Sequence, residues 1–315
     1  MRLVFCGTGE IGIPALEYLL GDPSHQVLAV VTQPDKPAGR DLKPRASAVK
    51  LLAEARGVPV FQPPKLRDPV AMEVLRGLHP DLLVVVAYGQ ILSKSVLDWP
   101  RLGCLNLHAS ILPRHRGASP IQAALLAGDR ETGMSVMWMN EGLDTGDVLL
   151  VEKIDILPDD TAGSLHDRLA AVAPAALRSA LTLIAGGQAP RIPQDPALAT
   201  HAPKLRKSEG WIDWTLPSRE LALRVRAMSP WPGAFGRLKG RVLKIHAASA
   251  VEGSGVPGCI LRADAEAFVA ACGSGALQIH ELQAEGRRRM TARDFLCGAG
   301  ITPGDVFDLS FLPVD

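Results

Sequence analysis

The chain has 315 residues, of which 47% are hydrophobic and 21% are charged, and its formal net charge is +1. A chain of this length is typically two domains, each large enough to bury its own core. The near-neutral balance excludes overall charge as a source of attraction to nucleic acids or anionic membranes, so any such partner must be recognised by local clusters.

The cysteines and apolar runs indicate where the protein works. Five cysteines are present, widely spaced and without a C-x-x-C pair, at Cys6, Cys104, Cys259, Cys272 and Cys297. This pattern argues against disulfides and a structural zinc site and favours a reducing compartment. The N-terminal apolar run is too short for a signal peptide, and the longest runs, such as 82–87, have the length of a buried strand. We therefore expect a soluble cytoplasmic protein with no metal and no membrane partner.

The first half of the chain alternates β-rich runs with helical patterns. In chain order we predict a strand at 2–6, a helix at 13–20, a strand at 27–32, a helix at 46–56, a strand at 58–62, a helix at 69–78, strands at 82–87 and 103–108, and helices at 120–127 and 162–184. Continuous Val/Leu-rich strands alternating with helices predict an α/β, Rossmann-like domain whose mostly parallel sheet is covered on both faces. Active sites of such sheets lie beyond the carboxyl ends of the strands.

The second half has a different character. Residues 186–203 contain two glycines and four prolines with little periodicity, which is typical of a linker. Short strand-like runs follow, at 233–237, 241–247, 258–261, 267–271 and 276–282. Such runs predict a small closed or partly open β-barrel of the oligonucleotide-binding (OB) type. The predicted division is a catalytic domain at 1–187, a linker at 188–206 and an OB-like barrel at 207–315.

A glycine-rich turn after the first strand invites a dinucleotide-binding interpretation. Residues 7–12 read GTGEIG and match G-x-G-x-x-G between a strand and a helix. The acidic residue expected at the end of the second strand is not clearly supplied, because the nearest acid, Asp35, falls late. The turn therefore fits a tight strand-to-helix connection better than a nucleotide site.

Three polar residues form the strongest chemical signal. Asn106 and His108 lie two residues apart in CLNLHASILPRHRG (104–117), so alternation along a strand points both side chains to one face. Asp144 lies in LDTGD (143–147). An amide donor, a proton-handling ring and an acid that orients the ring are suited to stabilising an oxyanion and moving protons at a carbonyl. Because no Ser, Cys or Lys stands among them as an obvious nucleophile, we expect the acceptor's own nucleophile to attack the carbonyl.

Together with TQPDKPAGR (32–40), AYGQIL (87–92), SPWPGAF (229–235) and DFLCGAGITPGDVF (294–307), these motifs resemble the formyltransferase family that uses 10-formyltetrahydrofolate. The resemblance covers nearly the whole chain and implies that Asn106, His108 and Asp144 are catalytic. It also implies that the loop after the strand contacts the folate, through Ser110, Ile111, Leu112 and Pro113.

The resemblance further implies the acceptor. Members of this kind formylate the amino group of methionyl initiator tRNA, and the loop matching 33–45 contacts the acceptor stem. The basic residues of that loop are Lys36, Arg40, Lys43 and Arg45, with Arg40 the most important by resemblance. An α-amino group has a pKa near 7.7–8.0, so a useful fraction is neutral and nucleophilic at cellular pH. We expect a monomer whose OB-like barrel also binds tRNA.

Three departures and several alternatives accompany this interpretation. The family often has glycine where this chain has Ala109, an aromatic residue where it has His115, and proline where it has Gly9. A formyltransferase acting on a sugar-nucleotide or another small amine would use the same fold, and related folate hydrolases share the catalytic trio. A nicotinamide-dependent oxidoreductase would rest on the GTGEIG turn alone. A non-catalytic RNA-binding module would leave the three polar residues without a purpose.

Overall fold

The computed structural model describes residues 1–38 and 43–310. The chain divides into two compact units. The first comprises residues 1–120, 131–155 and 166–203, and the second comprises residues 121–130, 156–165 and the chain from residue 204 onward.

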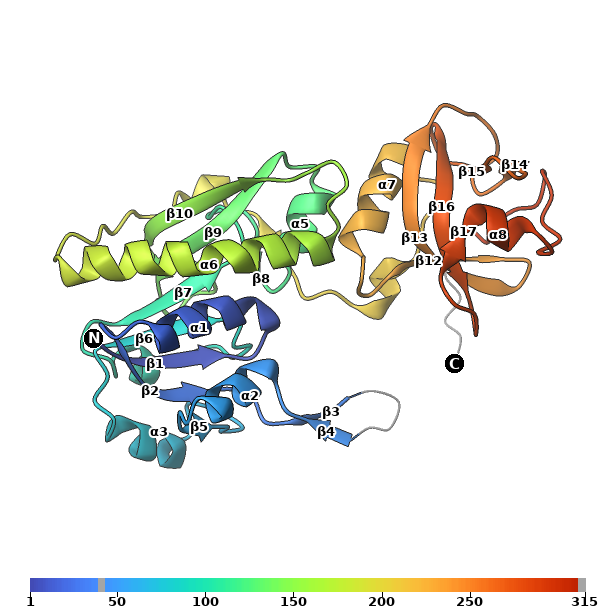
Figure 1. The fold of residues 1–315 in the computed structure, drawn as a ribbon. Helices are drawn as coiled ribbons and strands as arrows, with labels where there is room; N and C mark the ends of the chain where they lie inside the picture. The colour runs from blue at the N-terminus through green and yellow to red at the C-terminus, as the bar shows by residue number, and fades with distance from the viewer. Residues whose placement is uncertain (39–42, 311–315) are drawn as a thin grey trace. The chain divides into compact units, whose positions relative to one another are not determined.

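The first unit is built on one mixed sheet with the strand order β10-β9-β7-β6-β1-β2-β5 (Figure 1). Its strands are β1 (Arg2–Gly7), β2 (Gln26–Val31), β5 (Val60–Phe61), β6 (Leu82–Val86), β7 (Cys104–His108), β9 (Glu131–Trp138) and β10 (Val148–Asp155). The five strands from β7 to β5 in this order are parallel to one another. β9 pairs antiparallel with β7 on one side and with β10 on the other. The predicted Rossmann-like, mostly parallel sheet is confirmed, and the two antiparallel strands at its edge are an addition.

Helices cover both faces of this sheet. They are α1 (Ile13–Gly21), α2 (Ala48–Ala55), α3 (Pro69–Arg76), α4 (Lys94–Leu97) and α6 (Ala162–Ala185), most of which lies in this unit. On one face Met72 and Leu75 of α3 pack with Val4 and Cys6 of β1. On the other, α1 and α6 lie side by side (Figure 1), where the Arg178 guanidinium stands 5.1 Å from the centre of the Tyr18 ring.

Local sequence explains where several helices begin. The Ser47 side chain caps α2 by accepting from the backbone N–H of Lys50, and Asp68 caps α3 by accepting from Val70, with Pro69 in the first turn. Such caps satisfy backbone donors that a helix start otherwise leaves unpaired.

The helix α6 is long and apolar. Within the described chain it is the one helix whose length and composition would allow it to cross a membrane, and 39% of its apolar window is buried inside the protein. Its buried residues recur every three or four positions, at Leu165, Leu169, Ala173, Leu177 and Leu181. This spacing is that of a helix covering a globular core.

The glycines of the GTGEIG turn are required by packing. A Cβ on Gly7 would lie 2.5 Å from the Phe5 ring, and one on Gly9 would lie 3.0 Å from the Cβ of Ala87. A short 3-10 helix (Glu10–Gly12) then leads into α1. The close approach of the turn to β6 therefore accounts for the glycine pattern.

Two small sheets are fastened to the first unit. β3 (Lys36–Ala38) and β4 (Lys43–Arg45) form an antiparallel hairpin, with Lys36 opposite Arg45. β8 (Arg116–Gly117) pairs in parallel with β11 (His201–Ala202), which lies in the stretch predicted as a linker.

The second unit holds an antiparallel sheet with the order β12-β13-β16-β15-β14, and β17 pairs with β16. Its elements are α5 (Pro120–Leu126), a short 3-10 helix (Lys207–Gly210), α7 (Ser218–Ala227), β12 (Ala234–Leu238), β13 (Arg241–Val251), β14 (Ile260–Ala263), β15 (Phe268–Ala271), β16 (Ala276–Ala284), β17 (Met290–Thr291) and α8 (Ala292–Leu296). Another short 3-10 helix, Pro196–Leu198, belongs to the first unit. The predicted second domain built from short antiparallel strands is confirmed; its helices α7 and α8 were not predicted.

The segment around Phe307 links the two edges of this sheet. Phe307 bridges Leu238 at the end of β12, and Val306 bridges Cys259 next to β14. The Phe307 ring is buried and stacks on Trp214, with the ring centres 4.4 Å apart. A barrel needs its edge strands joined, and this segment joins them.

Candidate active site

Strand β7 places the first two predicted catalytic residues. It lies between β6 and β9, and its five residues are all buried. Asn106 and His108 share one face of the strand near its carboxyl end, where they are 9% and 6% exposed. The predicted alternation therefore brings a side-chain amide and an imidazole to the edge of the sheet at which α/β proteins build their sites.

Asp144 reaches the same place from the turn between β9 and β10. The Asn140 side chain accepts from the Gly142 N–H at 3.0 Å and from the Thr145 hydroxyl at 2.8 Å, which shapes the turn. A Cβ on Gly146 would lie 1.7 Å from the Trp138 carbonyl oxygen, so the turn requires glycine there. Asp144 itself has φ 53°, a left-handed conformation that acidic and amide residues tolerate better than most. Such backbone strain is common where a side chain must be aimed.

The three side chains meet around the carboxylate. Asn106 Nδ2 donates to Asp144 Oδ1 at 3.2 Å, and the Gly117 backbone N–H donates to Oδ2 at 2.9 Å. His108 Nδ1 stands 3.6 Å from the same Oδ2. The Asp144 side chain is only 11% exposed, so these donors supply the hydrogen bonds that a buried carboxylate needs.

The opposite nitrogen of His108 determines the tautomer. Nε2 lies 2.9 Å from the backbone carbonyl of His115. A carbonyl can only accept, so Nε2 carries a proton and donates it. In the neutral ring Nδ1 is therefore the unprotonated nitrogen, and it faces Asp144. Once protonated, Nδ1 would form an ion pair with the carboxylate.

The loop 110–113 is less open than the sequence implied. Ser110 is fully buried, and its hydroxyl donates to the Arg114 carbonyl at 2.7 Å. Leu112 packs against Met137 in a small cluster. Ile111 and Pro113 are half-buried. Of the four residues assigned to folate contact, these two therefore have side chains with exposed surface.

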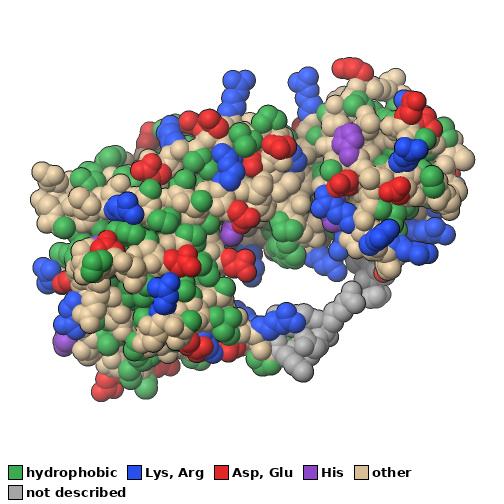
Figure 2. Space-filling model, viewed as in Figure 1, with side chains coloured by type: hydrophobic (Ala, Val, Ile, Leu, Met, Phe, Trp, Pro, Cys, Tyr) green, Lys and Arg blue, Asp and Glu red, His purple; other side chains and the backbone are tan. Residues whose placement is uncertain are grey.

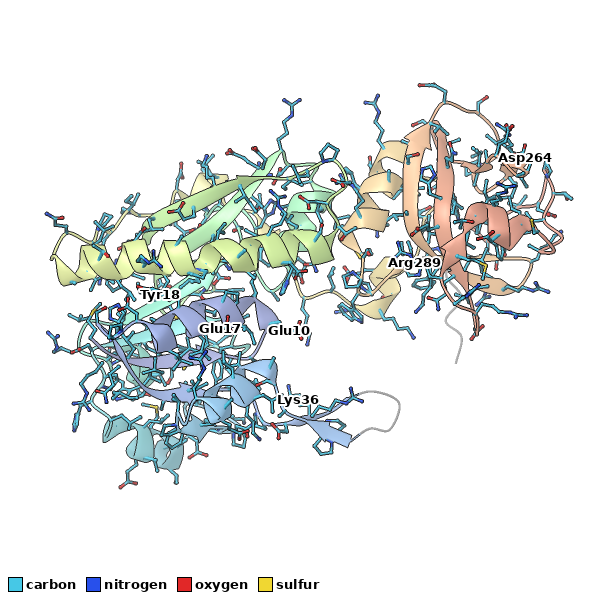
Figure 3. All side chains as sticks on the ribbon, in the orientation of Figure 1. Glu10, Glu17, Tyr18, Lys36, Asp264 and Arg289 are labelled. Carbon is cyan, nitrogen blue, oxygen red and sulfur yellow. The ribbon has the colours of Figure 1, made fainter. Side chains whose placement is uncertain are left out.

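The basic hairpin is described in part. Figure 3 shows Lys36 projecting from the β3–β4 hairpin. Arg40, the residue given most weight by resemblance, lies outside the described residues, as does the side chain of Lys43. Arg45 ends β4 opposite Lys36.

An ion pair fastens the start of this hairpin to the first unit. Lys50 Nζ donates to Asp35 at 2.8 Å, and Gln62 Nε2 donates to the other oxygen at 2.7 Å. The hydrogen bond from Lys50, followed by that from Gln62, lowers the pKa of Asp35. The carboxylate therefore stays charged through the neutral range, and the hairpin keeps this attachment at neutral pH.

Two further polar residues border the site and were not predicted. Arg116 is 8% exposed, and its Nε and Nη2 donate to Gln194 Oε1 at 2.9 and 2.7 Å. Gln194 Nε2 in turn donates to the backbone carbonyls of Asp144 and Gly146 at 2.9 and 2.7 Å. Arg116 lies within the motif that carried the resemblance, whereas a glutamine in a proline-rich stretch gives no sequence signal of its own.

Comparison with known families decides the relationship. The formyl transferase family model matches residues 1–181, and the model of the formyl transferase C-terminal domain matches residues 204–300. The chain belongs to the formyl transferase family. The matched halves correspond to the mixed sheet with the Asn106–His108–Asp144 cluster and to the antiparallel sheet of the second unit.

Named relatives agree along nearly the full length. The methionyl-tRNA formyltransferase of Geotalea uraniireducens is 48% identical over 97% of both chains, and that of Pseudomonas paraeruginosa is 51% identical over 93% of this chain and 94% of its own.

Solved structures share the fold. The methionyl-tRNA formyltransferase of Clostridium thermocellum covers 81% of this chain and 95% of its own, with a TM-score of 0.56 at 16% identity. The N-formyltransferase of Helicobacter canadensis, solved with folinic acid and dTDP-3-aminofucose, covers 92% of this chain and 100% of its own, with a TM-score of 0.66 at 17% identity. At these identities the similarity establishes architecture alone.

Proposed function

We propose that this protein transfers the formyl group of 10-formyltetrahydrofolate to the amino group of methionyl initiator tRNA. The observation that carries the proposal is the cluster of Asn106, His108 and Asp144 at the sheet edge, in a chain 45–51% identical to relatives named methionyl-tRNA formyltransferase. A sugar-nucleotide amine is a weaker candidate acceptor, because the proteins named for it share the fold at only 15–17% identity.

The neighbouring side chains favour direct attack by the acceptor amine. The Ser110 hydroxyl donates to its own loop, so it is not activated by His108. Burial raises the pKa of the Cys104 thiol to about 12, which keeps that thiol protonated at neutral pH. The amine of an aminoacyl group is partly neutral at that pH and needs no covalent enzyme intermediate.

The chemistry then follows from the contacts. Asn106 Nδ2 has one proton engaged by Asp144 and a second that can donate to the oxygen of the formyl carbonyl as charge develops on it. A protonated His108 ring would add positive charge beside the same oxygen, with Asp144 opposite Nδ1 balancing that charge. One such donor typically contributes about 2.7–4 kcal/mol to transition-state stabilisation. The proton released by the attacking nitrogen can pass to Asp144 through water and then to the departing nitrogen of the folate.

The folate would lie against the loop 110–113. Ile111 and Pro113 have exposed apolar surface, and the buried pair Ser110 and Leu112 hold the loop in place. Apolar walls with few polar anchors suit a pterin ring. The Ser135 hydroxyl supports the loop by accepting from the Leu112 N–H at 3.1 Å and donating to the Ser110 carbonyl at 2.6 Å.

Two basic surfaces would bind the tRNA. The first is the hairpin with Lys36, Arg40, Lys43 and Arg45. The second is a basic patch on the second unit formed by Arg241, Lys244, Arg287, Arg288 and Arg289, all of them exposed. The turn that carries the three arginines starts beside β13, because the Glu285 N–H donates to the Val242 carbonyl. Within this set Arg289 pairs with Glu281.

The basic and acidic charges of the second unit are partly separated. Figure 3 shows Arg289 and Asp264 at different ends of this unit, and Figure 2 shows Lys and Arg side chains gathered on its lower part in that view. Acidic Asp264 and Glu266 pair with Arg262 near the β14–β15 turn. Sequence counting alone could not reveal this separation, and it favours RNA contact by one face.

Replacing Arg287 and Arg288 together by glutamine is expected to weaken tRNA binding and its salt dependence. Each phosphate contact contributes nearly one to the slope of log affinity against log salt, so the slope should fall by about one to two. Binding of charged initiator tRNA between 50 and 200 mM salt measures this. Arg262→Gln is the matched control, because Arg262 pairs with acids at the other end of the unit. An unchanged slope in the double variant would remove the patch from the interface.

The function itself is tested by formylation of charged initiator tRNA. We expect formylmethionyl-tRNA to accumulate only when 10-formyltetrahydrofolate is present, and a sugar-nucleotide amine offered in place of tRNA to remain unmodified. Formylation of the sugar amine without activity on the tRNA would replace the proposed acceptor. Formate release without any acceptor would identify a hydrolase instead.

A further inference from the structure

The segment 190–202 runs along the loop that follows β7 and along the turn that carries Asp144. On the side of the Asp144 turn, hydrogen bonds join Pro190 to Trp138, Ile192 to Val148, and Gln194 to Asp144 and Gly146. On the side of the loop after β7, they join Gln194 to Arg116, Thr200 to Pro113, His115 and Arg116, and Ala202 to Ala118 and Ser119. Thr200 Oγ1 accepts from the His115 N–H at 2.8 Å. The same segment thus holds the turn of Asp144 and the residue whose carbonyl fixes His108.

Gln194 is the side chain through which the segment reaches Asp144. Its Nε2 donates to two carbonyl oxygens of the turn, those of Asp144 and Gly146. Its Oε1 accepts from both Nε and Nη2 of the buried Arg116 guanidinium. Every hydrogen-bonding direction of this amide is therefore used, with the donor side toward the turn and the acceptor side toward the arginine.

We propose that Gln194 is a positioning residue for formyl transfer, which sets the direction of the Asp144 carboxylate by fixing the backbone of its turn. The proposal rests on the proposed function, because it assigns Gln194 a part in that same site. Gln194 touches the backbone on either side of the aspartate and not the carboxylate itself, so it acts through Asp144.

The physical need for such a residue is visible in the turn. Asp144 is held at φ 53°, a conformation that the backbone does not favour on its own. The carboxylate must also meet Asn106, Gly117 and His108 at once. A displacement of about 1 Å in such a constellation can lower a rate by about a hundredfold. The two bonds from Gln194 to the turn oppose that displacement.

Position 194 needs both a hydrogen-bond acceptor for Arg116 and a donor for the carbonyls of the Asp144 turn, and glutamine supplies both. In Gln194→Glu the pairing with Arg116 remains, but an oxygen replaces the donor that faces the two carbonyls. In Gln194→Leu the guanidinium and both carbonyls lose this partner. An unpaired buried polar group is costly, so the turn and the arginine must rearrange in either variant.

The first measurement is steady-state formylation of charged initiator tRNA. We expect kcat to fall by about tenfold to a hundredfold in Gln194→Leu and Gln194→Glu, with the KM for both substrates nearly unchanged. Gln188→Leu, at an exposed glutamine two residues before this segment, is the matched control and should match the wild type. The melting temperature of each variant shows whether a lower kcat reflects loss of the fold. If Gln194→Leu does not fold, Gln194→Glu alone tests the proposal.

A double-variant cycle separates positioning from a general structural role. If Gln194 acts through Asp144, Gln194→Leu should cost little further activity in an Asp144→Asn background, since the carboxylate it aims is already absent. Full additivity, or an unchanged kcat in both single variants that fold, would overturn the proposal.

A readout that needs no turnover keeps the two proposals distinguishable. In protein with 15N-labelled histidine, the imidazole resonances of His108 report the neighbouring carboxylate. We expect Gln194→Leu and Asp144→Asn to move these resonances in the same direction, and Gln188→Leu to leave them in place. If the wild type fails to formylate methionyl-tRNA but these shifts occur, the proposed acceptor is wrong and the positioning role stands. If it formylates and no shift occurs, the positioning role fails alone.

Discussion

Asp144→Asn is expected to lower formyl transfer by at least about a hundredfold while leaving the fold intact. The variant removes the negative charge 3.6 Å from His108 Nδ1 and turns one acceptor of the carboxylate into a donor. That new donor would face either the Asn106 amide or the Gly117 N–H, both of which already donate there. The rate of formylmethionyl-tRNA formation at saturating folate measures the loss, whose lower bound is that of a single oxyanion donor.

Asparagine is a sharper probe at this position than alanine. Asp144 has a positive φ, and asparagine tolerates that conformation where alanine does not. The matched control is Asp147→Asn, the same substitution three residues along the same motif, which should stay near wild-type activity. Equal losses in both variants would show that the turn, and not the carboxylate at 144, governs the rate.

The same reasoning extends to the other two members of the cluster. Asn106→Ala and His108→Ala should each lower the rate by at least about a hundredfold. Because residues that act as a unit are strongly non-additive, combining either with Asp144→Asn should cost far less than the product of the single effects. A folded His108→Ala variant with near wild-type turnover would contradict the assignment.

Strand periodicity and motif were sufficient to predict part of the site. Asn106 and His108 share a face because they are two apart in a buried strand, and they lie near the carboxyl end of β7, as predicted. Asp144 could be added only through its motif, since nothing in local sequence places a turn residue opposite a strand 38 positions earlier. Gln194 is 50 positions from Asp144, and its role depends wholly on that tertiary approach.

Burial was the hardest property to predict from local patterns. Ser110 follows a strand and has the residue type of an exposed loop, yet it is fully buried with its hydroxyl bonded to Arg114. His115 stands where relatives often have an aromatic residue, and it is 6% exposed with its Nδ1 3.3 Å from Thr200 Oγ1. Thr200 is 85 positions from His115, and Ser135, whose hydroxyl donates to the Ser110 carbonyl, is 25 positions from Ser110, so a local sequence window contains neither partner.

The same limit applies to the fold. The parallel strands were predicted because both of their faces are buried and their sequences are continuously apolar, as in β6. β9 and β10 were not predicted, although Glu131–Trp138 is almost wholly buried. The run begins with Glu, Thr and Gly and includes two methionines, so it lacks the Val/Ile pattern typical of strands. The glycine of this run is required by packing, because a Cβ on Gly133 would lie 2.4 Å from the Glu152 carbonyl oxygen.

Phe307→Ala is expected to destabilise the second unit by about 3–5 kcal/mol. The ring is 1% exposed and stacks on Trp214 at 4.4 Å and on Phe268 at 6.4 Å between ring centres. Its loss leaves a cavity in the middle of the antiparallel sheet's core. The Phe307 backbone donates to the Gly258 carbonyl at 2.9 Å and bridges Leu238, so a loosened residue also weakens the join between the two sheet edges. Calorimetry should show one thermal transition lowered by roughly 10–20 °C.

Leu309→Ala is the control for this prediction, since Leu309 lies two residues further along and is 44% exposed. Surface substitutions of that kind usually change stability by no more than about 0.5 kcal/mol. The basic patch lies on β13 and beyond β16 of the same sheet, so the Phe307→Ala protein should lose tRNA affinity at temperatures above its lowered transition while its first unit remains folded. If affinity persists there, the patch is not the tRNA-binding surface. If the transition itself does not move, the segment around Phe307 does not hold the sheet closed.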